Sequence, residues 1–570
     1  MSGTDTPTKH SVGDYARASW TRTRELLPGR ADLLAAKRNP KRDLIAGVTV
    51  AVVALPLALA FGISSGLGAG AGIATAIVAG IVAAIFGGSN LQDSGPTGAM
   101  TVVLVPIVTK HGASSVLVVG LIAGVILIAL GYARAGRYMR YIPLPVVEGF
   151  TIGIAVIIGL QQVPSALGVH PSASKVAIAA AQSVKLWFES PTWAPVLFAS
   201  SVAISMLVAA RFRPSLPMSL AAIVVVTVIV KVAHIDVAVI GAIPRGLQSP
   251  HFPAISFGEI EALIVPAIAV AALAALESLL SATVADGMSV GEHHNSDREL
   301  FGQGMANLVV PLFGGIPATA AIARTAVNVR SGARSRTAAV THSLVLLAIV
   351  LVAAQWVATI PLAALAGVLI ATAIQMVEVS SVLVLLRATR SDALVLAITA
   401  IATVAFDLVT AVIVGIAVAG VLALRQMARS AHIDEIPLDE GDHVTEEQNL
   451  LAEHIVAYRL DGALFFGAAH TFLLELSEVS DVRVVILRLS RIATIDATGA
   501  SLLADTIKRL EARGITVLLS GVKPEHVRIF SHLGVYNELA DERHIFTTTP
   551  GAIAHARKHA QRIAHEAETG

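Results

Sequence analysis

The chain from residue 43 to residue 428 alternates between long apolar runs and short polar loops. A helix rises about 1.5 Å per residue, so about 20 apolar residues cross a hydrocarbon core about 30 Å thick. The runs that fit a membrane segment fall into two groups of seven. The first group is Leu44–Ile63, Ala71–Phe86, Thr97–Thr109, Val116–Tyr132, Val146–Leu167, Pro195–Ala210 and Met218–Val232. The second group is Leu263–Ala285, Leu300–Phe313, Thr319–Val329, Ala338–Ile360, Leu362–Val377, Ala393–Phe406 and Leu408–Leu424. The pattern predicts an α-helical polytopic membrane protein with 14 segments. A further stretch, Val176–Trp187, is amphipathic and is predicted to lie at the membrane interface rather than to cross the membrane.

The third segment of each group is short and follows a break in the backbone. Gly95 and Pro96 precede Thr97–Thr109, and Pro317 precedes a helix that is predicted to begin at Thr319. A helix that begins inside a membrane leaves unpaired N–H groups and about half a positive charge at that end. Such an end attracts anions. Two interrupted segments at matching positions in two halves indicate the binding site of a transporter.

Basic residues in the loops give the orientation. Loops on one side are rich in arginine: Arg134, Arg137, Arg140, Arg211, Arg213, Arg298, Arg330, Arg334, Arg336, Arg387, Arg390, Arg425 and Arg429. The other side holds only Lys110, Lys175, Lys185, Lys231 and Arg245. The positive-inside rule therefore predicts a multi-pass protein of the inner (plasma) membrane with both termini in the cytoplasm. Because each group has an odd number of segments, the two groups are inverted, and the two half-helices meet with their N-termini near the midplane.

Composition excludes several other classes of protein. The chain is 55% hydrophobic and 14% charged, with a mean hydropathy of +0.74, which no soluble globular protein approaches. It has no cysteine, so disulfides, thiolate metal sites and cysteine nucleophiles are ruled out. It also lacks a phosphate-binding Gly-x-x-x-x-Gly-Lys-Ser/Thr loop. We therefore expect no enzyme activity, no cofactor, no metal and no nucleic-acid partner.

The two ends of the chain are polar. Residues 1–42 are basic and are predicted to form a cytoplasmic tail, and 43–428 form the transporter domain. Residues 429–452 are an acidic linker, and 453–570 alternate between strands and helices with short loops. This last pattern predicts a small cytoplasmic α/β domain, with strands at 454–460, 463–467, 482–489, 492–496 and 515–521. Its helices are predicted to begin at His470, to run from about Thr498 to Arg513, and to begin at Glu525.

Three stretches of sequence resemble the SulP (sulfate permease) anion transporters. They are DLIAGVTVAVVALPLALAFG at 43–62, GGSNLQDSGPTGAM at 87–100 and ELFGQGMANLVVPLFGGIPATAAIARTAVNVRSGA at 299–333. The C-terminal domain is similar to a STAS domain, because IDATGASLL at 495–503 matches its strand–loop–helix signature. The resemblance implies a fold of seven plus seven inverted repeats with two half-helices. It also implies a core bundle that moves against a gate bundle, and a homodimer.

Glu277 is the candidate coupling residue, with Ser281 one helical turn later on the same face. Placing a carboxylate inside the membrane costs free energy, so such a residue indicates a functional site. The alternative is that Glu277 only makes a structural hydrogen bond to a neighbouring helix. In the resemblance, cyanobacterial bicarbonate members carry Asp at this position as a sodium ligand, together with a Thr on the tenth helix. Here the matching position is Ile322, which has no ligand oxygen. The sequence therefore favours a proton over sodium as the coupling ion.

The candidate anion site combines backbone and side-chain groups at the two half-helix ends. Arg324 adds a full positive charge there, and an ion pair with a neighbouring acid is its alternative role. The predicted substrate-binding residues are Thr97, Gly98, Ala99, Thr101, Thr319, Ala320, Ala321 and Arg324.

The C-terminal domain and one loop carry further residues to consider. In the resemblance, Thr498 aligns with the phosphorylated Ser of bacterial anti-sigma-factor antagonists, so it is a possible phosphorylation site. The alternative is that Asp496 and Thr498 only cap a helix. His293 and His294 lack a third ligand nearby in the sequence, so no metal is expected there.

These observations predict secondary active transport of a small anion, with proton-coupled uptake of sulfate as the leading hypothesis. A bicarbonate or C4-dicarboxylate symporter, and an uncoupled anion exchanger or channel, are the alternatives. A membrane sensor with the STAS domain as its output is a third class, which the two half-helices disfavour.

Overall fold

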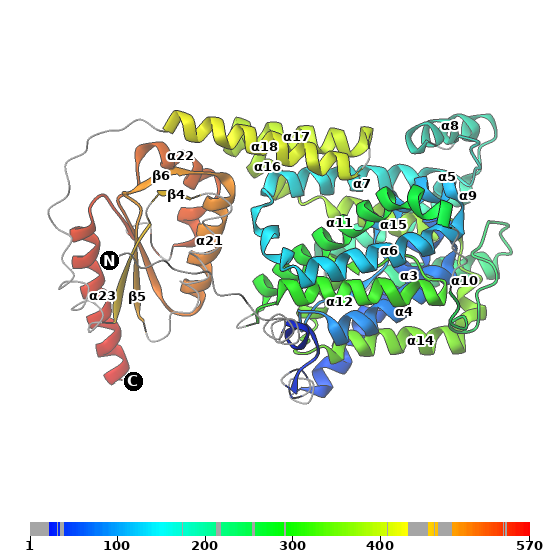
Figure 1. The fold of residues 1–570 in the computed structure, drawn as a ribbon, viewed down its shortest axis with the longest axis horizontal. Helices are drawn as coiled ribbons and strands as arrows, with labels where there is room; N and C mark the ends of the chain where they lie inside the picture. The colour runs from blue at the N-terminus through cyan, green and yellow to red at the C-terminus, as the bar shows by residue number, and fades with distance from the viewer. Residues whose placement is uncertain are drawn as a thin grey trace, which may run out of the picture. The chain divides into compact units, whose positions relative to one another are not determined.

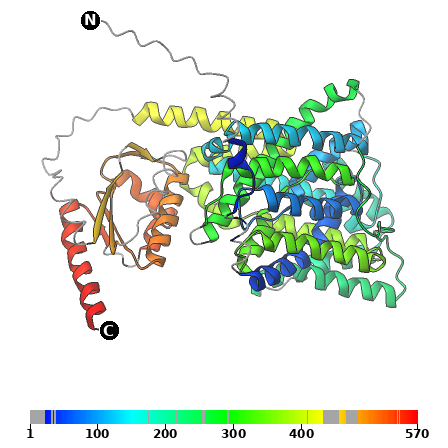
Figure 2. The same cartoon turned by 60° about the horizontal axis from the view of Figure 1, so that its bottom comes forward.

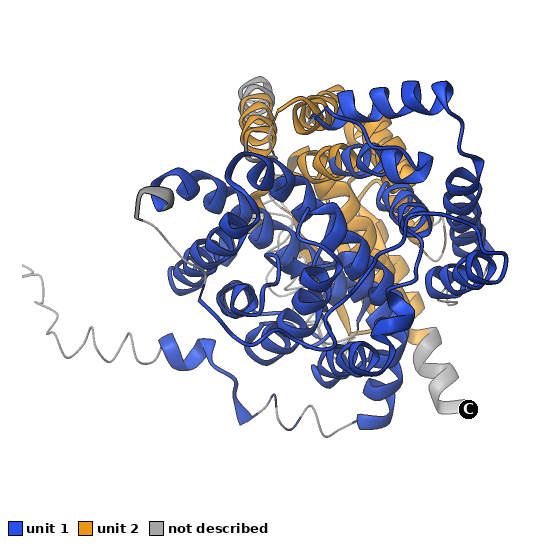
Figure 3. Cartoon of the chain, turned by 90° about the vertical axis from the view of Figure 1, so that its right-hand side faces the viewer, with its two compact units in different colours: residues 1–139, 154–377, 407–409 blue, residues 140–153, 378–406, 410–570 orange. Residues whose placement is uncertain are grey.

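The computed structural model describes residues 22–30, 32, 34, 39–173, 175–212, 218–252, 257–289, 292–406, 408–430, 454–460, 462–464, 482–539, 541 and 544–569. The chain divides into two compact units, coloured in Figure 3. Unit 1 holds residues 1–139, 154–377 and 407–409, and unit 2 holds 140–153, 378–406 and 410–570. Most of the predicted linker 429–452 lies outside the described residues.

Helices make up nearly all of the membrane region, and each predicted segment corresponds to one of them (Figure 1). In the first group they are α3 (Pro40–Ser64), α4 (Ala69–Phe86), α5 (Gly98–His111), α6 (Ala113–Tyr132), α7 (Leu144–Leu167), α9 (Trp193–Phe212) and α10 (Met218–Val232). In the second they are α11 (Phe257–Met288), α12 (Ser296–Val309), α13 (Ile322–Arg330), α14 (Thr337–Val357), α15 (Leu362–Met376), α17 (Arg390–Ala405) and α18 (Leu408–Ser430). The predicted helical membrane fold is thereby confirmed.

These helices differ in length and hydropathy. Among the described residues, eight helices are long and apolar enough to cross a membrane, and Gly98–His111, Met218–Val232 and Thr410–Ala423 are shorter apolar helices. The predicted amphipathic segment Val176–Trp187 corresponds to the helix α8 (Val176–Glu189), whereas the helix α16 (Val379–Ala388) was not predicted. The 3-10 helices are η1 (Ala135–Tyr141), η2 (Val310–Phe313) and η3 (Val535–Glu538).

Small residues allow close packing around the half-helices. Helix α12 packs on both α4 and α6, and α14 packs on α3 and α4 (Figure 1, turned in Figure 2). At the crossing of α12 and α4, a Cβ atom added to Gly302 would meet the backbone of Gly87. Because backbone atoms cannot move aside as a side chain can, α12 and α4 can cross this closely only with glycine at position 302.

A polar cluster ties the N-terminal region to the loops of unit 1. The Asp32 carboxylate accepts hydrogen bonds from Arg298 at 2.7 and 3.2 Å and lies 3.3 Å from Arg336. Burial opposes ionisation of this carboxyl, but Arg298, the Gly29 N–H and Arg336 together hold the pKa of Asp32 below its usual value. The Arg336 guanidinium also donates to the carbonyls of Ala84 and Gly87, at the C-terminal end of α4.

The C-terminal domain is an α/β fold, as predicted, and its strands pair in parallel. Its strands are β3 (Ile455–Arg459), β4 (Gly462–Leu464), β5 (Val484–Arg488), β6 (Ile492–Ile495), β7 (Thr516–Ser520) and β8 (Ile545–Phe546). Its helices are α21 (Ala497–Ala512), α22 (Pro524–His532) and α23 (Thr549–Thr569). The main sheet has the order β3-β5-β7-β8, and β4 pairs with β6. A predicted helix from His470 lies outside the described residues.

Alternating side chains of β5 bury both faces of this sheet. Val485 and Leu487 pack in a cluster with α21 and α22, whereas Val484 and Ile486 pack in a second cluster with α23. Figure 1 shows α21 and α23 on opposite sides of the strands. The sequence analysis predicted α21 and α22 but neither β8 nor α23.

Candidate functional site

The two half-helices are joined by a two-stranded antiparallel pair immediately before they begin. Strand β1 (Ser94–Gly95) precedes α5, and strand β2 (Thr319–Ala320) precedes α13. Ser94 pairs with Ala320, and Gly95 pairs with Thr319. The pairing satisfies backbone groups that would otherwise be unpaired inside the membrane. It also brings the two helix starts to one place, as the matching positions in the sequence predicted.

The predicted start of the second half-helix was wrong by three residues. Helix α13 begins at Ile322 rather than Thr319, because Thr319 and Ala320 belong to β2. The Ser278 hydroxyl of α11 holds this strand, lying 2.9 Å from Thr319 Oγ1 and accepting from Ala320 N–H at 3.3 Å. Thr319 Oγ1 also donates to the carbonyl of Ala274. The Thr319 hydroxyl is therefore a structural group and not a free donor for an anion.

The shift changes which backbone groups can meet an anion at α13. The N–H groups of Ala320 and Ala321 donate to Ser278 Oγ and to the Asp93 carbonyl, so these two predicted ligands are already paired. The first turn instead presents the N–H groups of Ile322, Ala323 and Arg324, which have no partner within the helix. Ile322 is 41% exposed, so this end is open.

Helix α5 begins where the sequence predicted. Thr97 is its N-cap, and its hydroxyl accepts from Met100 N–H at 3.3 Å. The N–H groups of Gly98 and Ala99 are the first of the helix and have no partner within it, so these two residues remain predicted ligands. Thr101 does not match, because its hydroxyl donates to the Gly98 carbonyl at 2.6 Å.

Glu277 lies on α11, directly beside the start of α5. Thr97 Oγ1 donates to Glu277 Oε2 at 2.8 Å, so the capping hydroxyl joins the carboxylate to the helix end. The Glu277 side chain is partly exposed. Ser281, the other predicted coupling residue, is fully buried and donates to Thr325 Oγ1 at 2.9 Å. Ser281 therefore ties α11 to α13, while Glu277 is the group that faces a helix start.

Arg324 has a partner that the sequence analysis left unnamed. Its Nε lies 3.3 Å from Asp93 Oδ2, and His342 Nδ1 lies 2.7 Å from Asp93 Oδ1. Arg324 is only 1% exposed, and Asp93 and His342 are 0% exposed. The structure thus favours the alternative role of Arg324, an ion pair with a neighbouring acid. No single stretch of sequence indicates this cluster, because its residues come from α13, the α4–α5 connection and α14.

The guanidinium also explains Gly95. A Cβ atom at position 95 would lie 2.8 Å from Arg324 Nη1 and 3.1 Å from Nη2. Both Nη atoms are buried without a hydrogen-bond partner among the described residues. The absence of a side chain at Gly95 therefore leaves space for the buried Arg324 guanidinium next to β1.

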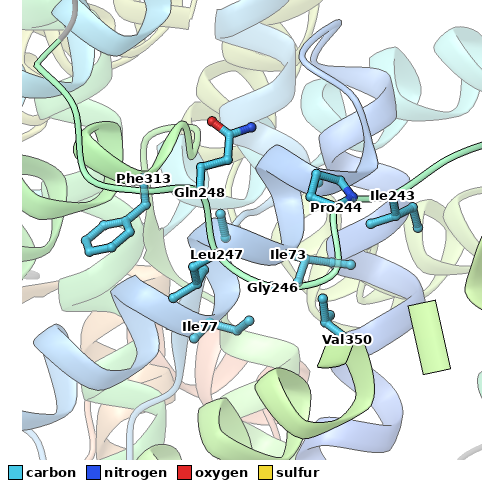
Figure 4. A pocket seen from close by; sticks show the side chains of 11 residues that line it. Ile73, Ile77, Ile243, Pro244, Gly246, Leu247, Gln248, Phe313 and Val350 are labelled. Carbon is cyan, nitrogen blue, oxygen red and sulfur yellow. The ribbon is translucent and has the colours of Figure 1, made fainter. Parts of the chain in front are cut away.

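A pocket in the same unit is lined by none of these residues (Figure 4). It is lined by eleven residues that include Ile73, Ile77, Phe313 and Val350, and Gln248 is the one polar side chain among them. An apolar lining gives a small anion no charge to bind. The pocket therefore does not compete with the half-helix starts as the candidate site.

The remaining predicted residues lie in loops and in the α/β domain. Asp496 is the N-cap of α21, and its carboxylate accepts from Gly499 N–H at 2.7 Å. Thr498 lies in the first turn of the helix and is half-buried. The N-cap is therefore Asp496 and not Thr498. His294 Nδ1 lies 2.7 Å from Asp286 Oδ2, and His294 Nε2 lies 3.0 Å from Ser296 Oγ. These contacts give His294 a structural role in its loop.

Comparison with known proteins gives the same picture. The model of the sulfate permease family matches residues 41–399, and the model of the STAS domain matches residues 449–552. The chain is 34% identical to the putative sulfate transporter YvdB of Bacillus subtilis, covering 89% of this chain and 96% of the relative. It is 31% identical to the bicarbonate transporter BicA of Synechocystis, covering 88% of this chain and 91% of that protein.

Solved structures agree with the fold. The transmembrane domain of a cyanobacterium bicarbonate transporter BicA matches with a TM-score of 0.58 and 33% identity, over 67% of this chain and 98% of that chain. The overall structure of SLC26A9 matches with a TM-score of 0.65 over 99% of both chains, and at 16% identity it supports the fold alone. The two family matches and the near full-length relatives lead to one conclusion: the chain belongs to the sulfate permease family.

Proposed function

We propose that this protein is a secondary active transporter that takes up sulfate together with protons. The family is one of anion transporters and not of enzymes, which agrees with the sequence-based expectation. The observation that carries the proposal is the hydrogen bond between Thr97 and Glu277. It links a titratable carboxyl to one of the two helix starts that would hold the anion.

Charge balance gives the direction of coupling. The starts of α5 and α13 each offer positive partial charge, and Asp93 compensates Arg324. Among the described residues at the two helix starts, an ionised Glu277 beside Thr97 is then the uncompensated negative charge, so it repels an anion. Protonation removes that repulsion, so the anion and the proton each favour the binding of the other. A carrier with this linkage transports the two together, as a symporter.

The choice of coupling ion rests on Ile322. This side chain is exposed at the start of α13 and carries no oxygen that could ligate sodium. The Glu277 carboxylate already accepts the Thr97 hydroxyl, which suits a group that gains and loses a proton. Sodium coupling would need additional oxygen ligands at this point.

Sulfate is the proposed substrate because the first of the relatives above is a putative sulfate transporter. Bicarbonate is the second candidate, since BicA relatives match at 31% identity over most of the chain. Backbone N–H groups recognise negative charge and do not distinguish these two anions. A flux panel in proteoliposomes with sulfate, bicarbonate and succinate across pH separates the candidates.

The test of coupling is Glu277→Gln. The variant keeps the side-chain shape and a hydrogen-bond acceptor for Thr97, so we expect it to bind and exchange sulfate. It should not accumulate sulfate when a pH gradient is imposed. Glu261→Gln is the matched control, because Glu261 is an exposed carboxylate on the same helix. Accumulation by the Glu277 variant, or strict sodium dependence of the unmodified protein, would contradict proton coupling.

The same proposal fixes an orientation and an assembly. Both termini and the STAS domain are proposed to lie in the cytoplasm, and the protein is proposed to be a homodimer. Because the chain has no cysteine, Arg334→Cys and Lys110→Cys report the two sides without background. Both side chains are exposed in the structure. An impermeant thiol reagent added outside should label position 110 only, and labelling of position 334 would overturn the orientation.

A further inference from the structure

Three histidines of the C-terminal domain come together at the edge of its sheet. His544 precedes β8, the last strand in the order β3-β5-β7-β8, while His555 and His559 lie on α23. Their ring centroids are 5.0 to 5.5 Å apart in every pairing. The three residues are separated by up to 15 positions in the sequence, so the fold gathers them.

The spacing of these imidazoles suits a transition-metal ion. One ring nitrogen from each histidine lies within 4.8 Å of those of the other two. In a tetrahedral zinc site, Zn–N bonds of about 2.0–2.1 Å place the ligand nitrogens about 3.4 Å apart. Small rotations of the side chains close this difference. Three histidine ligands with one open position form a recognised zinc arrangement.

The helix presents two of the ligands by its own periodicity. His555 and His559 are four residues apart, so they lie on one face of α23. Ala552, Ala556 and Ala560 form the neighbouring face, which is buried against Val484, Ile486 and Leu518 of the sheet. Packing of this alanine face fixes the rotation of α23 and thereby directs both histidines toward His544.

Burial argues that the cluster is more than a solvated group of side chains. His544 is 3% exposed, and His555 Nε2 is buried without a hydrogen-bond partner among the described residues. A buried ring nitrogen without a partner costs free energy, which a bound metal would recover. The Phe546 ring lies 5.2 Å from that of His555 and covers one side.

We propose that His544, His555 and His559 bind one divalent ion of the zinc class. The ion would join the terminal helix α23 to the edge strand β8, in addition to the alanine contacts. The STAS family match ends at residue 552, before two of the three ligands. The site is therefore an extension of this chain's domain, and it gives that domain a way to respond to metal concentration.

The experiment uses the full-length protein, purified without a polyhistidine tag and stripped with a chelator. We expect it to bind one Zn²⁺ per chain and to give the visible absorption of tetrahedral Co²⁺ when Co²⁺ is added. Zn²⁺ should also slow amide hydrogen exchange along α23. His555→Ala or His559→Ala should weaken Zn²⁺ binding by at least about 100-fold, since even outer-shell groups contribute about 10–100-fold.

The helix variants guard against a failure to fold, because alanine is the best helix former. His532→Ala is the matched control: it removes an exposed histidine from the last turn of α22 and should leave binding unchanged. The proposal is overturned if the double variant His555→Ala/His559→Ala still binds one Zn²⁺ per chain. It is equally overturned if Co²⁺ gives no tetrahedral spectrum with the unmodified protein. Neither result depends on transport, so the proposed function is tested separately.

Discussion

The starts of α5 and α13 face the same site, yet the protein builds them in opposite ways. Helix α5 has a side-chain cap, Thr97, and its first residues are buried. Helix α13 has Ala321 as its N-cap, which makes no side-chain bond, and its first residues are exposed. The α5 end is thus attached to Glu277, while the α13 end stays open. In the proposed function, both ends attract the anion, the α5 end also links the site to protons through Glu277, and the α13 end offers the more exposed N–H groups.

The largest expected effect is that of Arg324→Ala. If the buried Arg324–Asp93 pair is structural, its loss leaves the buried Asp93 carboxylate with His342 as its remaining neighbour and without its arginine, and breaking a buried ion pair costs about 3–5 kcal/mol. Thermal unfolding in detergent should show a strongly lowered Tm. Arg330→Ala on the same helix is the control, because Arg330 is exposed and should change little. A variant of normal stability that has lost only sulfate binding would instead return Arg324 to the predicted anion ligands.

A smaller effect is expected when the open end is given a cap. Ala321→Ser supplies a hydroxyl that can accept from the first turn of α13, which stabilises a helix by about 1 kcal/mol. The same bond occupies N–H groups that the anion would use, so sulfate affinity should fall while Tm rises. Binding by calorimetry and unfolding by heat measure the two changes on one sample.

The converse substitution removes the cap at the other end. Thr97→Val deletes the hydroxyl that joins α5 to Glu277, and we expect a loss of about 1 kcal/mol in stability. The pH dependence of sulfate uptake should shift in this variant, because Glu277 loses its hydrogen-bond donor. An unchanged pH profile would show that the two helix starts do not differ in their link to protons.

The smallest effect tests the cluster around Asp32, which belongs to neither helix start. Because the pKa of Asp32 is lowered in the fold, its contribution is present above the pKa of the unfolded chain, about 3.9, and is lost as the pH falls through the folded value. Asp32→Asn should cost about 1 kcal/mol or less at pH 7, and nothing in strong acid. Sulfate affinity should stay the same, which separates this cluster from the site.

The membrane segments could be predicted from the sequence because a membrane-spanning helix needs about 20 consecutive apolar residues, and such runs are visible in the sequence. The sequence analysis also found both half-helix starts, since Pro96 and Pro317 interrupt apolar runs at matching positions. It misplaced the start of α13 because Thr319 and Ala320 could equally begin a helix or form a strand. Only the pairing with Ser94 and Gly95, distant in the sequence, decides between the two.

The partners of Arg324 were out of reach for a related reason. Asp93 precedes α5 and His342 lies within an apolar helix, so neither has a local signal that connects it to α13. The zinc-class cluster was missed because β8 and α23 were not predicted. His555 and His559 have the spacing of a helical pair, but their third member comes from another element.

The Asp93–Arg324 pair also has an electrical consequence for a moving core. A carboxylate and a guanidinium that move together carry no net charge, so the membrane potential does no net work on the pair. Moving one unpaired charge across a membrane potential of 100 mV changes its free energy by about 2.3 kcal/mol. Among the described charges at the two helix starts, the proposed mechanism then leaves Glu277 and the cargo for the voltage to act on. An empty carrier with ionised Glu277 has the same charge as one loaded with a proton and bicarbonate. A carrier loaded with a proton and sulfate has one negative charge more, so the membrane potential itself would distinguish the two anions.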